Sequence, residues 1–254
     1  MTNPVIISFL VPAYNEEKYI ERCLASIRNA KKPEYEIIVA NDRSTDKTEE
    51  ILENQEQKYN DIRIINNKKN QGLGAVRNLL LDEARGEYIY YVDADDYLAP
   101  DTNFIKLLSF MHENDLEILE VAIKGIEVNS TKTYSAYKPE LEGIVLSGDQ
   151  YLKKIYSFIP SLSLRVYRRE FILNHKIRFR ERRYEDVIFT LSSTLKCKKM
   201  AITNESIYIY EQLDESIMRS SPSKDSIRDA IALSYDLEDI YLRNSSNKII
   251  LKSM

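Results

Sequence analysis

The sequence predicts an α/β fold in which a mostly parallel sheet is flanked by helices. Short apolar runs alternate with helix-periodic segments through the first hundred residues, which is the rhythm of strand, helix and strand. Polar clusters directly follow several of these runs, as happens where parallel strands end at one edge of a sheet. The length of 254 residues and the hydrophobic content of 43% suit one large α/β domain, alone or with an appendage.

Four strands and three helices are predicted before residue 100. The strands are VIISFLV (5–11, bounded by Pro12), YEIIVAN (35–41), IRIIN (62–66) and YIYYV (88–92). The second helix begins at Asp46, which forms a capping-box pattern with Glu49, and the third covers residues 73–84. The first helix follows from four apolar residues whose spacing places them on one face: Ile20, Cys23, Leu24 and Ile27.

The second half is predicted to be less regular. Its elements are a helix at 104–114, a strand at 116–126, a polar loop or hairpin at 129–143, helices at 147–156 and 185–197, a strand at SIYIYE (206–211) and a last helix at 224–242. The final residues, NKIILKSM, carry no stop signal, which suggests a truncated chain.

The composition argues against several classes of protein. A formal charge of -4 gives no reason to expect nucleic-acid binding. Cys23 and Cys197 are far apart in the sequence, so free thiols in a reducing cytoplasm are expected rather than a disulfide framework. The N-terminal residues lack the basic start and long apolar core of a signal peptide, and the apolar stretch Val5–Val11 is far shorter than the ~20 residues of a membrane span.

The strand-end sequence YIYYVDADDYLAP (88–100) concentrates negative charge. Asp93, Asp95 and Asp96 fall within four positions, and crowded carboxylates are costly unless a cation or a shared proton relieves their repulsion. A hard divalent cation takes oxygen ligands, and Mg²⁺ usually completes its shell with water and substrate phosphates. The stretch therefore predicts a metal–diphosphate site, and the alternative is a solvated acidic turn capped by Asp96.

Five segments in order resemble one family. VPAYNEEKYIERCLASI (11–27), EIIVANDRSTDKT (36–48), NQGLGAVRN (70–78) and GEYIYYVDADDYLAPD (86–101) are similar to the donor half of glycosyltransferase family 2, and YEDVIF (184–189) resembles its acceptor-side motif. The resemblance is strong over residues 5–100 and moderate over 147–219. It implies the GT-A fold, in which a Rossmann-like sheet is followed by a helical acceptor-side region, and an inverting sugar transferase that uses a nucleotide-diphosphate donor.

The resemblance implies contacts with the nucleotide. Tyr14, which follows Pro12, matches the position that stacks on the base, with plain packing as the alternative. Glu16 is expected either to contact the nucleoside or to cap the helix that begins nearby. Asp42 matches the aspartate that accepts a hydrogen bond from uracil. Arg219 matches a loosely defined segment and is expected to contact the donor diphosphate.

Further donor contacts are implied by the glycine-containing segment and the carboxylate cluster. Asn70 and Arg77 match a segment that closes around the base and ribose, and a surface ion pair is the alternative for Arg77. In the motif Asp93-Ala94-Asp95, the first aspartate would face the ribose and Asp95 would bind Mn²⁺ or Mg²⁺.

Two positions depart from the family pattern. The family often has glycine where this chain has Arg43, which would cost on the order of 1 kcal/mol if that position requires a positive φ. Some relatives have a histidine or arginine after the strand that corresponds to SIYIYE, whereas this chain has Glu211. A second protein ligand for the metal is therefore in doubt.

The acceptor side is predicted from two segments. Inverting transfer needs a base opposite the leaving group, and the family match favours Asp186 as that base, with Glu185 supporting its position. Helix capping is the alternative for both. Residues 165–183 hold eight Lys or Arg and two Glu, which indicates either a solvated face or a site for an anionic acceptor, such as a lipid diphosphate at a membrane surface.

The resemblance, together with the carboxylate cluster, implies a metal-dependent inverting glycosyltransferase that uses a nucleotide-diphosphate sugar, expected to be UDP-linked. The resemblance alone implies that it builds a bacterial surface glycan. The acceptor is expected to be a glycan or a polyprenyl-diphosphate-linked sugar, and the protein is expected in the cytoplasm, with peripheral contact at the inner face of the membrane. The donor half covers residues 1–100, the acceptor half 101–219, and a helical extension 220–254. Two alternatives are a sugar nucleotidyltransferase, which the glycine-free VPAYNEEKY disfavours, and a non-catalytic nucleotide-sugar-binding subunit.

Overall fold

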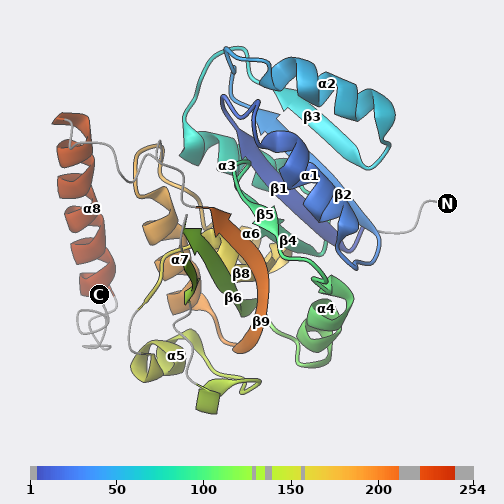
Figure 1. Ribbon diagram of the computed structural model, residues 1–254. Helices are drawn as coiled ribbons and strands as arrows, with labels where there is room; N and C mark the ends of the chain where they lie inside the picture. Colours follow the sequence, from blue (N-terminus) through green and yellow to red (C-terminus); the bar gives the residue numbers. More distant parts are fainter. Residues whose placement is uncertain (1–4, 128–129, 135–138, 156–157, 212–223, 244–254) are drawn as a thin grey trace.

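A computed structural model describes residues 5–127, 130–134, 139–155, 158–211 and 224–243. Within these residues the strands form one sheet of nine, in the order β3-β2-β1-β4-β8-β6-β9-β5, and β7 pairs with β6 (Figure 1). The sheet is continuous across residue 100, because β4 pairs with β8. The two predicted halves therefore share one sheet.

The first four strands are parallel, as predicted. They are β1 (Ile7–Ala13), β2 (Tyr35–Asn41), β3 (Ile62–Asn66) and β4 (Tyr88–Tyr91). The prediction that Pro12 bounds the first strand was wrong. Leu10 is the last residue of β1 that pairs with β4, and Pro12, two residues further on, points to the same side. The backbone position of Pro12 that lacks an N–H therefore points past the end of the β1–β4 pairing, where no strand residue would accept a hydrogen bond from it.

Three helices connect these strands, namely α1 (Ile20–Asn29), α2 (Thr48–Lys58) and α3 (Leu73–Glu83). The capping box predicted for Asp46 and Glu49 was wrong. The Asp46 carboxylate instead accepts hydrogen bonds from Thr48 N (3.0 Å), Thr48 Oγ1 (2.6 Å) and Glu17 N (3.1 Å). Asp46 thus ties the entry of α2 to the segment after β1, a tertiary contact that local pattern does not reveal.

The second half contains the predicted elements, one further strand and one further α-helix. The predicted elements are α4 (Phe104–Glu113), β6 (Ile118–Glu127), β7 (Ser130–Tyr134), α5 (Gly148–Lys154), α7 (Glu185–Lys196), β9 (Met200–Glu211) and α8 (Lys224–Arg243). β6 and β7 form the hairpin that was one of two predictions for residues 129–143. The elements missed in this half are β8 (Arg165–Arg168) and α6 (Arg169–Asn174), and the short strand β5 (Tyr97–Leu98) was missed at the end of the first half.

β8 was missed because an arginine enters the core. The Arg165 side chain is fully buried and pairs with Glu120 on β6 (2.9 Å), which is almost as buried. Arg165 also donates to Ile159 O and Ser161 O (both 2.9 Å). Buried charge is rare unless it is paired, so the sequence RVYR does not resemble a central strand, yet β8 lies antiparallel between β4 and β6.

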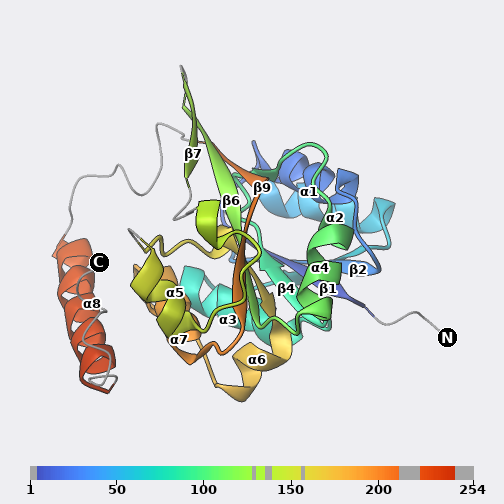
Figure 2. The ribbon, with the colours of Figure 1, turned by 90° about the horizontal axis from the view of Figure 1, so that it is seen from below.

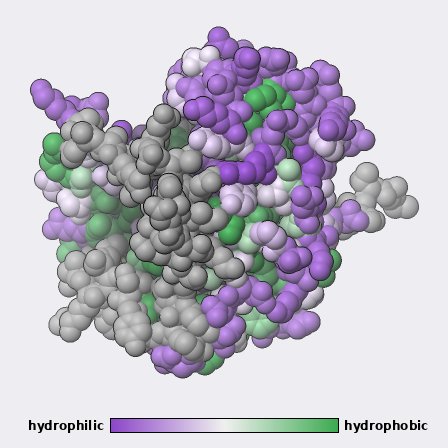
Figure 3. Space-filling model, viewed as in Figure 1, coloured by the Kyte–Doolittle hydropathy of each residue, from purple (hydrophilic) through white to green (hydrophobic). Residues whose placement is uncertain are grey.

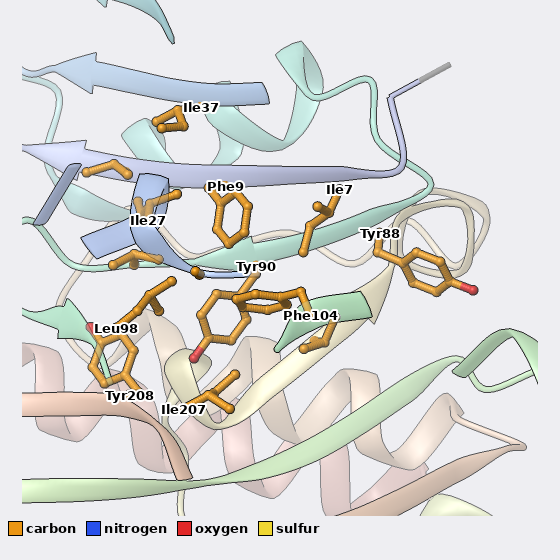
Figure 4. Close-up of a cluster of buried hydrophobic side chains, with 14 of the residues drawn as sticks. Ile7, Phe9, Ile27, Ile37, Tyr88, Tyr90, Leu98, Phe104, Ile207 and Tyr208 are labelled. Atoms are coloured by element: carbon orange, nitrogen blue, oxygen red, sulfur yellow. The ribbon is translucent and has the colours of Figure 1, made fainter. Parts of the chain in front are cut away.

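Helices cover both faces of the sheet. One face carries α1, α2 and α4 over a cluster that includes Phe9, Tyr90, Phe104 and Tyr208, whose rings Figure 4 shows close together. The other face carries α3, α5, α6 and α7, and α8 packs on the outside of α7 through Leu237 and Ile240 (Figure 2). Alternate residues of β1 enter the two clusters, as expected for a strand that is covered on both sides.

The burial of the two cysteines and the hydrophilic surface are typical of a folded α/β domain. Cys23 and Cys197 are both free, as predicted, and both are buried. Hydrophilic side chains dominate the surface over α2 and β3 in the view of Figure 3. None of the described helices combines the length and apolar character needed to cross a membrane.

Candidate active site

The ends of the parallel strands bring the predicted donor segments together. Asn15 N donates to Ser44 Oγ (3.0 Å), and Thr45 N donates to the Asn15 side-chain oxygen (2.8 Å), so the segments after β1 and β2 are joined. β4 lies beside β1, where Val92 N donates to Leu10 O (3.0 Å). Parallel topology therefore assembles polar residues that are distant in the sequence, as expected for the carboxyl edge of such a sheet.

Asp42 is buried at the end of β2 and holds the loop that precedes α3. Its carboxylate accepts hydrogen bonds from the Asn67 amide (2.8 Å), Gln71 N (2.9 and 3.1 Å) and Gly72 N (2.9 Å), and the Asn70 amide donates to its carbonyl (3.2 Å). A carboxylate offers about four lone-pair sites, so the loop nearly saturates this one. The contact with uracil stays a prediction, while the structure gives Asp42 and Asn70 a positioning role.

Asp42→Asn is expected to lower the free energy of unfolding by about 1–3 kcal/mol, because an amide nitrogen replaces one of two oxygens that accept backbone N–H groups. Chemical denaturation measures this loss. Glu53→Gln, which neutralises an exposed carboxylate on α2, is the control and should change stability by less than about 0.5 kcal/mol. Equal stability of the two variants would contradict the positioning role of Asp42.

Tyr14 and Arg43, two positions that the sequence singled out, have exposed side chains. Arg43 has φ = 64°, so the condition under which arginine is costly at this position holds. Tyr14 is 47% exposed, which makes the alternative of plain packing wrong and leaves a face of its ring accessible. Pro12 is buried within β1 and contributes to the site through the position of the strand.

Arg77 joins the donor side of the site to the acceptor side. It is 5% exposed, and its guanidinium pairs with Asp93 after β4 (2.7 Å) and with Glu185, the first residue of α7. Burial alone would lower the pKa of Arg77, but these carboxylates raise it above its ordinary value. The alternative of a surface ion pair was therefore wrong, and the role of Arg77 toward base and ribose stays a prediction.

Asp95 and Glu16 are carboxyl groups without an ion-pair partner among the described residues. Burial, and then the nearby Asp93, raise the pKa of Asp95 to about 6. Burial, followed by Asp95, Asp93 and Asp46, raises the pKa of Glu16 to about 8. Electrostatic repulsion therefore accumulates after β4, and a bound cation or a proton would relieve it.

The residues after β4 fit a hard divalent cation that is shared with a ligand. The described part of the chain has no group of three or more His, Cys, Asp or Glu side chains arranged to hold a metal ion by themselves. Asp95, which lies close enough to Glu16 to raise the pKa of Glu16, offers the carboxylate oxygens that Mg²⁺ and Mn²⁺ prefer. Such an ion would draw its other ligands from water and from a substrate diphosphate.

Glu16→Gln is expected to raise stability above neutral pH and to change it little near pH 4. Because the pKa of Glu16 in the folded chain is about 8, the folded chain keeps a proton that the unfolded chain loses near the ordinary value of 4.5. The resulting stability is complete below about pH 4.5 and is lost as the pH rises through about 8. Thermal melts between about pH 5 and pH 9 should therefore show a Tm that falls more for the wild type than for the variant, by roughly 2–6 °C.

Glu53→Gln supplies the control for this pH dependence, since Glu53 is an exposed carboxylate on α2. Its Tm should follow that of the wild type across the pH range. Parallel profiles for the wild type and Glu16→Gln would show that Glu16 is not held in a protonated state.

Asp186 is the unpaired carboxylate at the start of α7. Its Oδ1 accepts a hydrogen bond from Val187 N (2.9 Å), and it has no ion-pair partner among the described residues. Burial, and then the neighbouring Glu185, raise the pKa of Asp186 to about 6. A carboxylate with such a pKa can accept a proton near neutral pH. Glu185 supports α7 through its ion pair with Arg77, rather than through a hydrogen bond to Asp186.

Asp96 and Tyr208 were not recognised as a pair from the sequence. Asp96 is buried, and Tyr208 on β9 donates to its carboxylate (2.7 Å), so the side chain does not cap a solvated turn as the alternative proposed. Arg22 on α1 donates to Asp95 O (2.7 Å). These partners are separated by 73 to 112 residues, and no local signal links them.

The basic stretch is largely paired. Arg178 pairs with Asp82 on α3 (2.7 Å), and Arg180 and Arg182 both pair with Asp236 on α8. A purely solvated face was therefore wrong, and two of these arginines hold α8 against the domain. Arg183 is exposed and stays a candidate for an anionic acceptor.

Arg219 falls in residues 212–223, outside those that the structure describes. Its predicted contact with the donor diphosphate therefore stays a prediction. The side chain of Glu211 is likewise outside the described part.

Comparisons with known proteins bear on the family and the fold of the chain. Poly(ribitol-phosphate) beta-glucosyltransferase of Bacillus spizizenii is 32% identical over 80% of this chain, and the putative glycosyltransferase EpsH of Bacillus subtilis is 31% identical over 86%. The chain spans 32% and 64% of the lengths of these relatives, respectively. Crystalline Staphylococcus aureus TarS 1–349 in complex with UDP-GlcNAc superposes with a TM-score of 0.74 at 25% identity, covering 92% of this chain and 66% of that one.

A more distant structure, a mannosyltransferase from Pyrobaculum calidifontis, has the same fold at 15% identity, with a TM-score of 0.64 over 85% of this chain and 59% of that one. These structural neighbours confirm the predicted GT-A fold. The sequence model of glycosyl transferase family 2 matches residues 8–175, about two-thirds of the chain. The chain therefore belongs to glycosyl transferase family 2.

Proposed function

We propose that this chain transfers a sugar from a nucleotide-diphosphate donor, most simply a UDP-sugar, to an acceptor hydroxyl with inversion at the anomeric carbon. The observation that carries the proposal is the buried bridge of Arg77, which pairs with Asp93 of the donor turn and with Glu185 beside Asp186. The Arg77 guanidinium thus fixes the position of the turn after β4, on the donor side, relative to the carboxylate of Asp186, on the acceptor side. Membership of the family and the likeness to a structure that contains UDP-GlcNAc support a sugar nucleotide as the donor.

Asp186 acts as the general base in this proposal. A raised pKa and the absence of a described cationic partner leave its carboxylate able to take the acceptor hydroxyl proton while the hydroxyl oxygen attacks the sugar. Glu185 and Asp93 both pair with the Arg77 guanidinium, which positions α7 without taking part in proton transfer. A single displacement from the face opposite the leaving group inverts the anomeric carbon.

Asp95 would hold Mn²⁺ or Mg²⁺, with Glu16 nearby, and a bound ion would offset the charge of the departing diphosphate. Tyr14 supplies an exposed ring for the nucleotide base. Asp42 and Asn70 hold the loop between β3 and α3 in the conformation that surrounds the nucleoside. The backbone contacts described above keep this edge in place before the donor binds.

The acceptor is proposed to be a bacterial surface polymer or its lipid-linked precursor. Two curated relatives are named for poly(ribitol-phosphate), an anionic polymer. Arg183, exposed in the segment before α7, supplies positive charge on the acceptor side. An acceptor carried on polyprenyl diphosphate would bring this face to the inner surface of the membrane.

Donor hydrolysis provides the test. The chain is incubated with UDP-glucose, UDP-GlcNAc or GDP-mannose, with Mn²⁺ or with EDTA, and release of the nucleoside diphosphate is measured. UDP release that requires Mn²⁺ supports the proposal. Metal-dependent binding without release in the presence of acceptor would favour a binding subunit, and formation of the sugar nucleotide from sugar phosphate and UTP would favour a nucleotidyltransferase.

A further inference from the structure

The turn Asp93–Asp96 is held from two sides by elements that are far away in the sequence. From α1, Arg22 donates to Asp95 O (2.7 Å), and Ser26 Oγ accepts from Leu98 N (2.9 Å) just beyond the turn. From β9, the Tyr208 hydroxyl contacts both ends of the turn. The turn itself is closed by one backbone hydrogen bond, from Asp96 N to Asp93 O (3.1 Å).

Tyr208 makes two hydrogen bonds with one oxygen. Its O–H donates to Asp96 Oδ2 (2.7 Å), and its oxygen accepts from Asp93 N (3.1 Å). A tyrosine hydroxyl has one proton to donate and lone pairs to accept, so both contacts form together. Tyr208 is fully buried and Asp96 is 2% exposed, so neither contact competes with bulk water.

The rest of Tyr208 is fixed by packing. Its ring meets the Tyr90 ring edge-on, with 6.4 Å between centroids, and both belong to the cluster in Figure 4. β9 pairs with β5 directly after the turn, where Tyr208 faces Leu98. Packing therefore fixes the position of the Tyr208 hydroxyl, and its hydrogen bonds in turn hold the backbone of the turn that carries Asp95.

We propose that Tyr208 and Asp96 form a positioning pair that fixes the turn carrying Asp95 in the orientation needed for metal-dependent donor binding. The inference rests on the proposed function, and it assigns the third aspartate of the acidic cluster a role of its own. Asp93 pairs with Arg77, Asp95 is free for a cation, and Asp96 anchors the turn to β9. The anchor also makes donor binding depend on β9, which belongs to the acceptor half.

Tyr208→Phe tests the pair, because it removes one oxygen and keeps the ring. UDP affinity is measured by calorimetry with Mn²⁺ and with EDTA. The affinity in Mn²⁺ is expected to fall about 5- to 50-fold, the scale of a lost hydrogen bond to a charged group, while the affinity in EDTA stays the same. Loss of affinity by an equal factor in both buffers, or no loss in either, would overturn the inference.

Tyr90→Phe is the matched control. Tyr90 is also a fully buried tyrosine of this cluster, and its hydroxyl makes one hydrogen bond, to Ser163 O (2.6 Å), away from the turn. The two variants lose comparable stability, but only Tyr208→Phe loses metal-dependent affinity. Asp96→Asn approaches the same hydrogen bond from the other side and is expected to show a smaller, equally selective loss, since asparagine still accepts.

A double-mutant comparison separates positioning from direct contact. If Tyr208 acts through Asp95, Tyr208→Phe has no further effect on UDP affinity when Asp95 is already asparagine. An additional loss in that background would contradict the inference. Failure of the wild type to bind UDP more tightly in Mn²⁺ would instead defeat the proposed function, so the two failures are distinguishable.

Discussion

Asp186→Asn is expected to lower the rate of sugar transfer by about 10²–10⁴-fold while UDP and metal binding stay unchanged. Asparagine has the size of aspartate but does not take up a proton near neutral pH, and general-base catalysis is typically worth this factor. Donor binding is expected to rest on Asp42, Asp93 and Asp95, which the substitution does not touch. Single-turnover transfer and calorimetry with UDP measure the two properties separately.

Two controls frame this result. Asp149→Asn removes a carboxylate from the first turn of α5, as Asp186→Asn does from α7, but outside the site, and it should leave transfer unchanged. Glu185→Gln weakens the ion pair with Arg77 and is expected to cost less than Asp186→Asn if Glu185 only positions α7. Near-normal transfer by Asp186→Asn would assign the base to another group, of which Glu185 is the next candidate.

The pH dependence gives a second measure of the same base. Because the pKa of Asp186 is raised to about 6, the fraction of enzyme with an ionised base falls as the pH drops through about 6. The transfer rate of the wild type should fall over the same interval.

The product from an α-linked donor should be β-linked, and the anomeric coupling constant by NMR checks this. A retained α-linkage would overturn the single-displacement mechanism.

The residues at the donor-binding edge of the sheet could be predicted from the sequence, because in a parallel sheet a local pattern is enough to place a residue at that edge. Strands of one direction end at one edge, so an apolar run followed by polar residues places those residues in the site wherever they lie in the sequence. Asp42 and Asp95 follow from this rule and from the family resemblance. β8 could not be found in the same way, since Arg165 contradicts strand patterning until its buried partner Glu120 is known.

The connections between the site residues depend on tertiary structure. A sequence presents Arg77 as one surface-type residue on a helix, and only the fold shows two carboxylates converging on it from positions 16 and 108 residues away. Tyr208 similarly falls in an apolar strand whose alternation predicts burial but not a hydroxyl contact. Residue types and local spacing thus predicted candidates, while their pairing, and therefore which carboxylates stay free, required the packed structure.

Asp95→Asn is expected to abolish the gain in UDP affinity that Mn²⁺ provides, a loss of about 10²-fold or more, and to stabilise the unliganded protein at the same time. The loss follows because the carboxylate proposed to hold the cation is gone. The stabilisation follows because the substitution removes one of the charges that, together with burial, raise the pKa of Glu16. The pKa of Asp95 itself is raised to about 6 by burial and by Asp93, so folding disfavours its ionised form.

These two changes have opposite signs, which distinguishes loss of a metal ligand from misfolding. Thermal melts without ligand should give a higher Tm for Asp95→Asn than for the wild type above about pH 6, whereas melts with UDP and Mn²⁺ should show the larger increase in the wild type. Asp101→Asn, in the same segment and exposed, is the control and should bind UDP and Mn²⁺ as the wild type does. If Asp95→Asn kept the Mn²⁺-dependent gain in UDP affinity, the cation would have to be held elsewhere. A lower Tm of Asp95→Asn without ligand would show that the Asp95 carboxylate stabilises the fold, and would contradict the electrostatic repulsion that a cation is proposed to relieve.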